Sequence, residues 1–229
     1  MFFGLFDWTI LLVIPGFIIS VWAQIKVSTT FNKYSKMTTA RGLSGYAAAR
    51  QILDANGLYN VKIEQIRGEL TDHYDPRANV IRLSESVYHA TSPAAIGVAA
   101  HEAGHAIQYA TGYSPIKVRA NLVPITNIGS MLSMPIFIIG LIFAFPLLTN
   151  VGIILYSLVA LFQLVTLPVE FDASSRAMSV LQSSGMLNDD ELAASNKVLS
   201  AAAMTYVAAL LTSLLTLLRL LILANGRRR

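Results

Sequence analysis

Two histidines and a glutamate near the middle of the chain have the types and the spacing of a metal-dependent hydrolase site. They form the pattern His101-Glu102-Ala103-Gly104-His105, which is H-E-x-x-H. Positions i and i+4 of an α-helix share one face, so both imidazoles can bind one ion. Zinc suits this donor set and lowers the pKa of a bound water to about 7. Glu102 is rotated by about 100° from His101 and can act as the general base on that water.

A catalytic zinc ion needs a third protein ligand and one open position. The chain has no cysteine, so the ligand is a histidine or a carboxylate. Glu170 is favoured because two membrane crossings separate it from His105, and an even number of crossings returns the chain to the same face. One zinc ion per chain would then have the His₂Glu set. The other candidates are Asp172, Glu69, His73 and His89. Asp172 is either a reserve ligand or a partner of a histidine N–H.

The segments around the motif carry local signals of secondary structure. Ser92 followed by Pro93 is typical of a helix start, and this helix is expected over 94–110. Ser44 and Gly57 bound a second expected helix over 45–56. Alternating apolar residues predict strands over 61–66, 69–74 and 80–83, with a turn at 75–79. Together these elements form a small α+β domain.

The composition indicates a membrane protein. Hydrophobic residues make up 54% of the chain and charged residues 13%, about half of the charged share that soluble domains have. Charges are absent from 8–25, 120–169 and 198–218. Because about 20 helical residues cross a bilayer, we expect spans at 5–25, 124–146, 151–168 and 203–223, with a turn at 146–152. Arg219 can snorkel from the last span to the headgroups, and the first span lacks the basic start of a signal peptide, so it is interpreted as an anchor.

These spans divide the chain into five predicted parts. They are a first transmembrane helix (1–25), the soluble α+β domain (26–123), a transmembrane hairpin (124–168), a segment with the third zinc ligand (169–202), and a last transmembrane helix with a basic tail (203–229). Eight basic residues near span ends lie on one predicted side: Lys26, Lys33, Lys36, Arg41, Lys117, Arg119, Arg176 and Lys197. Only the arginines of 227–229 lie on the other, so the active site is expected to face the cytoplasm.

The chain resembles the YugP-type neutral zinc metallopeptidases. The resemblance rests on His-Glu-Ala-Gly-His-Ala-Ile-Gln at 101–108, on Glu-Phe-Asp-Ala-Ser at 170–174 and on the stretch 75–84, and it extends over nearly the whole chain. It implies a bacterial cell-membrane protein with a gluzincin-like fold, similar in plan to the HtpX-type membrane proteases. The implied zinc ligands are His101, His105 and Glu170, with Glu102 as the catalytic base.

Two details of the resemblance stay open. HtpX-type enzymes have an aspartate four residues after the third ligand, where this chain has Ser174, so the hydrogen-bond partners of the ligands are undefined. The strand over 79–84 is similar to the edge strand that pairs with the substrate backbone in such folds. The overall prediction is an α-helical membrane protein with about four transmembrane helices and a small α+β gluzincin-like zinc peptidase domain.

The predicted function is that of a membrane-embedded zinc endopeptidase acting on membrane-associated or unfolded proteins. The alternative is a catalytically inactive zinc-binding scaffold that partners another membrane protein. A pore is disfavoured because 120–169 contains no acidic, basic or histidine residue, and nucleic-acid binding is disfavoured because no dense basic face is present. The expected partners are a peptide or protein substrate and the lipid bilayer, and oligomeric state is not predicted. Candidates for oxyanion stabilisation are Arg176, His73, Tyr88 and His89.

Overall fold

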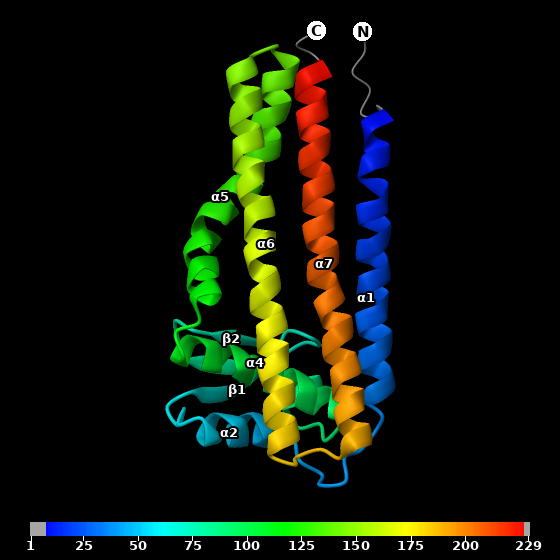
Figure 1. Ribbon diagram of the computed structural model, residues 1–229, viewed down its shortest axis with the longest axis vertical. Helices are drawn as coiled ribbons and strands as arrows, with labels where there is room; N and C mark the ends of the chain where they lie inside the picture. The colour runs from blue at the N-terminus through cyan, green and yellow to red at the C-terminus, as the bar shows by residue number, and fades with distance from the viewer. Residues whose placement is uncertain (1–7, 227–229) are drawn as a thin grey trace. The chain divides into compact units, whose positions relative to one another are not determined.

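The computed structural model describes residues 8–226, so the predicted start of the first span at 5–7 and the basic tail at 227–229 lie outside the described residues. In chain order the elements are a 3-10 helix (Trp8–Leu12), α1 (Ile14–Tyr34), α2 (Gly45–Ala55), β1 (Lys62–Ile66), β2 (His73–Asp75), β3 (Val80–Ser84), α3 (Glu85–Tyr88), α4 (Pro93–Ala110), α5 (Ser114–Ile142), α6 (Pro146–Ser183) and α7 (Asp189–Gly226) (Figure 1). The chain forms two compact units. The helical unit contains residues up to Gln24, Val118–Pro168 and the chain from Thr205 on, and the α/β unit contains Ile25–Lys117 and Val169–Met204.

Four helices are long and apolar enough to cross a membrane, which confirms the number predicted. They are Trp8–Tyr34, Ser114–Ile142, Pro146–Ser183 and Asp189–Gly226. Large apolar side chains cover their outer surface, including Phe17, Met131 and Ile154, each more than 60% exposed. A lipid solvent accommodates such a surface, whereas water does not.

The connection between α5 and α6 lies earlier than predicted. It comprises residues 143–145, with Ala144 at φ +51°, and Pro146 begins α6, where a missing N–H costs nothing. Gly152, expected in the turn, lies instead where the helices touch, since a Cβ there would be 2.7 Å from the Phe137 Cβ. Gly140 has the same role, with a Cβ position 2.4 Å from the Thr149 nitrogen. The glycines therefore allow close packing and do not form the turn.

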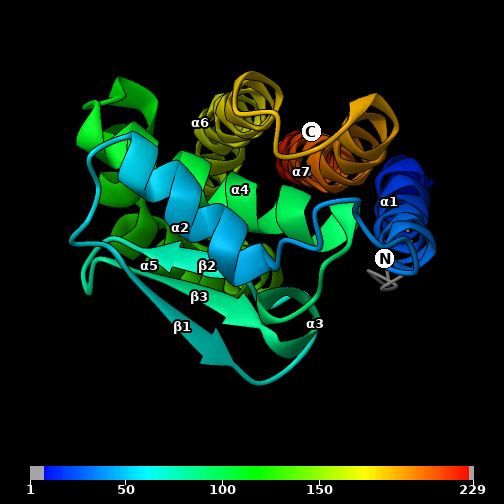
Figure 2. The same ribbon diagram turned by 90° about the horizontal axis from the view of Figure 1, so that it is seen from below.

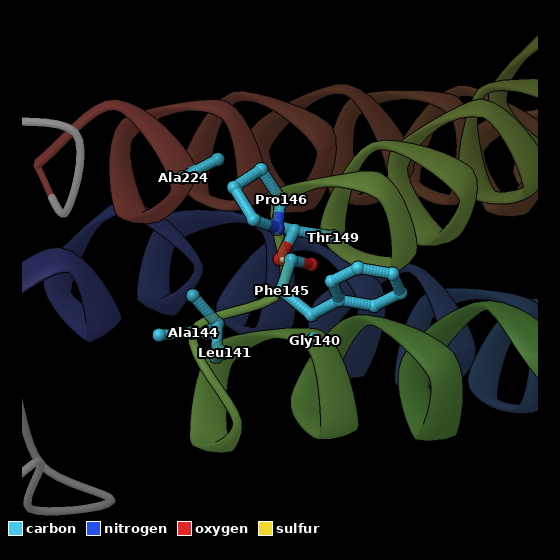
Figure 3. A pocket seen from close by; sticks show the side chains of 7 residues that line it. All are labelled: Gly140, Leu141, Ala144, Phe145, Pro146, Thr149 and Ala224. Atoms are coloured by element: carbon cyan, nitrogen blue, oxygen red, sulfur yellow. Dashed lines mark hydrogen bonds between the residues drawn. The ribbon is translucent and has the colours of Figure 1, made fainter.

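A small pocket lies beside this connection. Its lining consists of Gly140, Leu141, Ala144, Phe145, Pro146, Thr149 and Ala224. Figure 3 shows these residues at the end of α5, in the connection and at the start of α6, with Ala224 on α7. No lining residue carries an ionisable group, so this pocket offers packing surface and no acid–base chemistry.

The α/β unit contains a three-stranded sheet of order β1-β3-β2, in which β1 is parallel and β2 antiparallel to β3. The strands predicted over 61–66 and 80–83 are confirmed, but β2 has only three residues because Gly68 and Leu70 have positive φ angles that interrupt an extended chain. The Asp75 carboxylate accepts the N–H groups of Arg77 and Ala78 and forms the predicted turn. The expectation that 79–84 is an edge strand is wrong, since β3 is hydrogen-bonded on both sides.

Helix α4 forms the centre of the α/β unit. Its predicted bounds are confirmed, and the Ser92 hydroxyl accepts the Ala95 N–H as the N-cap; Ser44 caps α2 in the same way. Figure 2 shows α2 and α4 on one side of the sheet. One hydrophobic core joins α4 to α2, β3 and the parts of α6 and α7 in this unit; its members include Ile52, Leu83, Ala100, Leu181 and Val198. Helix α4 is thus held from several sides and provides a rigid platform.

Candidate metal centre

The two histidines of the motif lie one turn apart on α4 and face the same way. Their ring centroids are 4.7 Å apart, and the rings are nearly perpendicular. His105 is 8% exposed, and His101 is half-buried. Because fourteen of the eighteen residues of α4 are buried, the helix cannot rotate without unpacking the core. The orientation of both imidazoles is therefore fixed by the packing of their helix.

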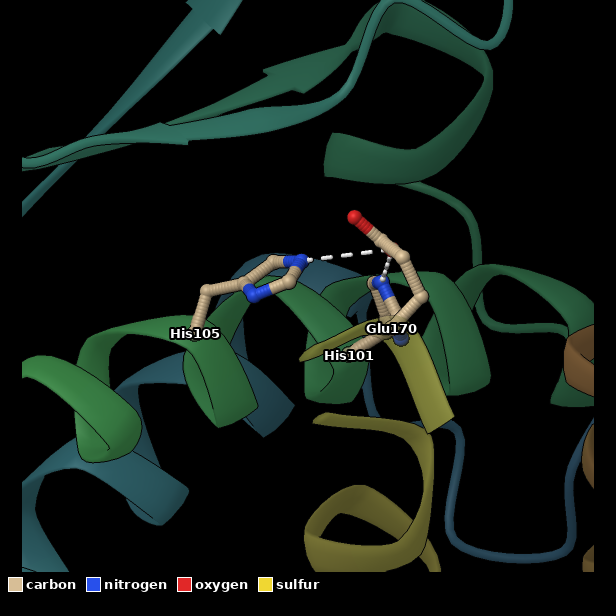
Figure 4. Close-up of side chains that lie close together, drawn as sticks. All are labelled: His101, His105 and Glu170. Carbon is tan, nitrogen blue, oxygen red and sulfur yellow. Dashed lines mark hydrogen bonds and ion pairs between the residues drawn. The ribbon is translucent and has the colours of Figure 1, made fainter. Parts of the chain in front are cut away.

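Glu170 extends from α6 toward both imidazoles (Figure 4). Its Oε2 atom lies 3.2 Å from His101 Nε2 and 3.6 Å from His105 Nε2. The ligand atoms of the three residues all lie within 4.8 Å of one another. Donors bound at about 2.0–2.1 Å in a tetrahedron lie about 3.3 Å apart, and both N···O distances are close to this value. Two nitrogens and one carboxylate oxygen thus fit one zinc ion.

Gly104 allows α6 to come close enough for this arrangement. A Cβ at position 104 would lie 2.6 Å from the Ala173 carbonyl oxygen, a backbone atom of α6 three residues after Glu170. The sequence contained the glycine within the motif, but its contact with a residue 69 positions away has no local signal. The backbone of α6 therefore rests directly on the motif helix at the level of the site.

The electrostatics of the site favour a positive charge. Burial by itself lowers the pKa of His105, but the Glu170 carboxylate, 3.6 Å from Nε2, and the charge of nearby Glu102 outweigh burial, so the pKa lies above its usual 6.5. The same two carboxylates that raise this pKa would stabilise a metal cation. A proton and a metal ion therefore compete for the same imidazole nitrogen.

Each imidazole has a second partner at its Nδ1 atom. His101 Nδ1 lies 3.1 Å from the Ser174 hydroxyl, and His105 Nδ1 lies 3.0 Å from Gln108 Oε1. Such outer partners orient metal-binding histidines. Ser174 is the residue that stands where the resemblance leads one to expect an aspartate. Gln108 was not singled out by sequence reasoning, although its i+3 spacing from His105 places both on one helix face.

Asp172 has neither of its two predicted roles, as a reserve ligand or as the partner of a histidine N–H. Its carboxylate accepts hydrogen bonds from Gln108 Nε2 at 2.7 Å and from Arg176 Nε at 2.5 Å. Among residues 8–226, the only metal-ligand group is His101, His105 and Glu170, and no hydrogen bond joins Asp172 to a histidine. Asp172 acts on His105 only through Gln108.

Glu102 lies beside the ligand cluster but outside it. Glu102 is 7% exposed. Within the described range its carboxylate accepts no hydrogen bond from another residue, which leaves the oxygens able to accept from a water molecule. A general base needs this availability together with proximity to the reacting atom.

The structure does not bring the remaining candidates into the cluster. Within the described part of the chain, Glu69, His73 and His89 all lie outside the metal-ligand group. His73 Nδ1 lies against the Thr71 carbonyl, and the Tyr88 ring contacts Tyr46 and His89. Arg176 is held by Asp172, by the Thr111 hydroxyl and over the Tyr113 ring. None of these contacts places a donor at the ligand cluster.

Comparisons with known proteins agree with this chemistry. The family described as "Putative neutral zinc metallopeptidase" matches residues 9–225. The Bacillus subtilis (strain 168) protein "Putative membrane protease YugP" is 49% identical over 219 residues, which are 95% of this chain and 97% of that protein. No solved structure matches the chain. With a histidine pair, a carboxylate in reach and a family match over almost its full length, the chain belongs to the neutral zinc metallopeptidase family.

Proposed function

We propose that the protein is a membrane-embedded zinc endopeptidase in which His101, His105 and Glu170 bind the metal and Glu102 is the general base. The proposal rests on the convergence of three ligand atoms on a buried face. Glu170 Oε2 lies 3.2 Å from His101 Nε2 and 3.6 Å from His105 Nε2. Zinc is favoured by the donor types, by the tetrahedral spacing and by the Nδ1 partners of both histidines.

When bound, zinc supplies a Lewis acid that polarises the scissile carbonyl and makes water acidic enough to lose a proton near neutral pH. The chain itself supplies the proton path. A Glu102 carboxylate oxygen accepts a proton from the attacking water as the C–O bond forms. The same oxygen then gives this proton to the amide nitrogen as the C–N bond breaks, so that the amine leaves neutral and Glu102 returns to its initial state.

Two features support an extended polypeptide as substrate. Strand β2 has one edge that is not paired within the sheet, and β2 contacts α4. An extended chain can add to such an edge through its backbone, with little selectivity for side chains. The edge role that the sequence placed at 79–84 therefore moves to β2 in this proposal.

Glu170 lies on α6 only two residues after the apolar segment that ends at Pro168. The substrates proposed are therefore unfolded or membrane-associated proteins. The protein itself is proposed to lie in the cell membrane of a bacterium. The distribution of lysines and arginines favours presentation from the cytoplasmic face.

The proposal is tested with the full-length protein in detergent, loaded with zinc, and an unfolded substrate such as casein. Glu102→Gln should lower the cleavage rate by at least about 10²-fold while zinc content stays at one ion per chain. His101→Ala and Glu170→Ala should lose zinc in elemental analysis. Cleavage that survives Glu102→Gln would reject the base, and zinc retained in Glu170→Ala would reject the third ligand. Zinc binding without hydrolysis of any substrate would instead indicate a non-catalytic scaffold.

A further inference from the structure

The side chain of Gln108 is buried in the wall of the site, although the proposed reaction does not use it. Its residue is 0% exposed, and buried amides are stable only when their polar atoms are hydrogen-bonded. Gln108 meets this condition with three contacts. Its Nε2 atom lies 2.8 Å from the Val169 carbonyl oxygen and 2.7 Å from Asp172 Oδ2, and its Oε1 atom lies 3.0 Å from His105 Nδ1.

The surroundings allow only one orientation of this amide. The Val169 carbonyl is an acceptor only, and the Asp172 oxygen already accepts the Nε–H of Arg176. Rotating the amide by 180° would place its oxygen against two other oxygens and leave both N–H groups without these acceptors. The NH₂ group therefore faces α6, and the oxygen faces His105.

This orientation determines which nitrogen of His105 carries the proton. Amide oxygen accepts hydrogen bonds and cannot donate them, so His105 Nδ1 must be the donor. In the neutral ring the lone pair then lies on Nε2, which is the atom that faces Glu170 at 3.6 Å. His101 has no comparable restriction, because the Ser174 hydroxyl can either donate or accept.

We propose that Gln108 is a positioning residue that selects the Nδ1–H tautomer of His105 and thereby keeps Nε2 ready to bind the metal. The inference rests on the proposed zinc site. The Gln108 amide also links the proposed ligand His105 to the segment of α6 that carries the proposed ligand Glu170, because its acceptors, the Val169 carbonyl and the Asp172 carboxylate, lie on either side of Glu170 in the sequence. One buried side chain thus orients the second histidine and holds the turn that carries the third ligand.

The first test is made on the wild-type protein without metal. In metal-free, ¹⁵N-labelled protein, at a pH high enough to keep the ring neutral, the ¹⁵N shifts of His105 report its tautomer. The signals are assigned by their loss in His105→Asn. We expect Nδ1–H to dominate in the wild type. A dominant Nε2–H form would overturn the inference, even if the protein binds zinc and cleaves substrates.

The second test measures zinc affinity by competition with a chromogenic chelator. Gln108→Met keeps the length of the side chain but has no amide oxygen, and we expect zinc affinity to fall about 10–100-fold, with Nε2–H gaining population in the metal-free variant. Asp172→Asn keeps an acceptor for the Gln108 N–H and should retain the Nδ1–H tautomer.

The matched control is Ser195→Ala. Ser195 is equally buried and donates to the Pro93 carbonyl of α4 at 2.7 Å, so its loss removes a buried hydrogen bond of the same helix away from the ligands. Zinc affinity in Ser195→Ala should equal that of the wild type. If Gln108→Met also binds zinc like the wild type, the positioning role is rejected while the zinc site stands. If the wild type binds no zinc, the proposed function itself fails. If Gln108→Met does not fold, the tautomer of the wild type decides.

Discussion

Gly104→Ala should separate the third ligand from the histidines without touching any ligand. The new methyl group would lie 2.6 Å from the Ala173 carbonyl oxygen, where 3.4 Å begins ordinary contact. Both atoms belong to helix backbones or are fixed directly to one, so a side-chain rotation cannot relieve the overlap. Helices α4 and α6 must therefore move apart at this level.

The required separation is about 0.8 Å, the difference between 3.4 and 2.6 Å. Zinc–oxygen bonds are about 2.0–2.2 Å long, and functional sites tolerate deviations of about 0.2 Å. Glu170 lies three residues from Ala173 on the same helix, so its carboxylate would recede by several times that tolerance. We expect zinc affinity to fall at least about 10-fold and the cleavage rate about 10²-fold, with about 1–3 kcal/mol lost in stability.

The assay combines zinc competition, casein cleavage and thermal unfolding of the full-length protein in detergent. Gly97→Ala is the control on the same helix, since its methyl group would lie 3.2 Å from the Ser195 side-chain Cβ and not against the backbone that carries a ligand. Gly97→Ala should lose some stability and keep its zinc affinity. If Gly104→Ala binds zinc as tightly as Gly97→Ala, close backbone contact does not position Glu170, and the reasoning is wrong.

Three further predictions concern the removal of zinc, the Ser174 hydroxyl and the Asp72 carboxylate. Removing zinc with a chelator should lower the melting temperature, because a ligand at 100 times its Kd stabilises the folded state by about 2.7 kcal/mol; an unchanged value after confirmed metal loss would contradict the link between α4 and α6. Ser174→Ala should weaken zinc binding roughly 10-fold by removing the partner of His101 Nδ1, whereas Ser174→Asp should retain it, and equal affinities measured by competition would exclude this role. Burial raises the pKa of Asp72 even though Ser84 donates to it, so the folded state binds the proton more tightly and wild-type stability falls as pH rises through that pKa. Asp72→Asn should therefore have a higher melting temperature than the wild type at pH 7, and the difference should shrink toward pH 4. A lower melting temperature for Asp72→Asn at pH 7 would contradict the expected destabilisation by the Asp72 charge.

The sequence predicts elements well where the signals are local. Ser92 followed by Pro93 fixes the start of α4, because a hydroxyl cap and a residue without an N–H both suit the first turn. The continuous helix α6 was not predicted. The sequence predicted a span that ends at residue 168, whereas Pro168 lies inside α6, which continues to Ser183. The lost hydrogen bond is tolerated because neighbouring helices hold the segment, and packing overrides the local preference.

The residues of the candidate site also differ in whether local sequence signals or packing between helices determine their positions. His101, Glu102 and His105 form a pattern within five residues, so their common helix face follows from the period of the helix. Glu170 was reached by counting membrane crossings, and the structure places it beside both imidazoles. Gln108 and Ser174 depend on how α4 packs against α6. Sequence spacing suggests that each lies near a ligand, but the atoms they meet are set by contacts between residues about 60–70 positions apart.

All contributions of α6 to the site come from a single stretch, residues 169–174. The Val169 carbonyl and the Asp172 carboxylate hold Gln108, Glu170 faces the histidines, and Ser174 meets His101. A displacement of this stretch would break the third ligand contact and both Nδ1 arrangements together, because one and a half helical turns move as a rigid piece. Zinc binding and the docking of this stretch on α4 should therefore be one cooperative event. Gly104 therefore contributes to the metal site without binding the metal, since it sets the distance at which the docking occurs.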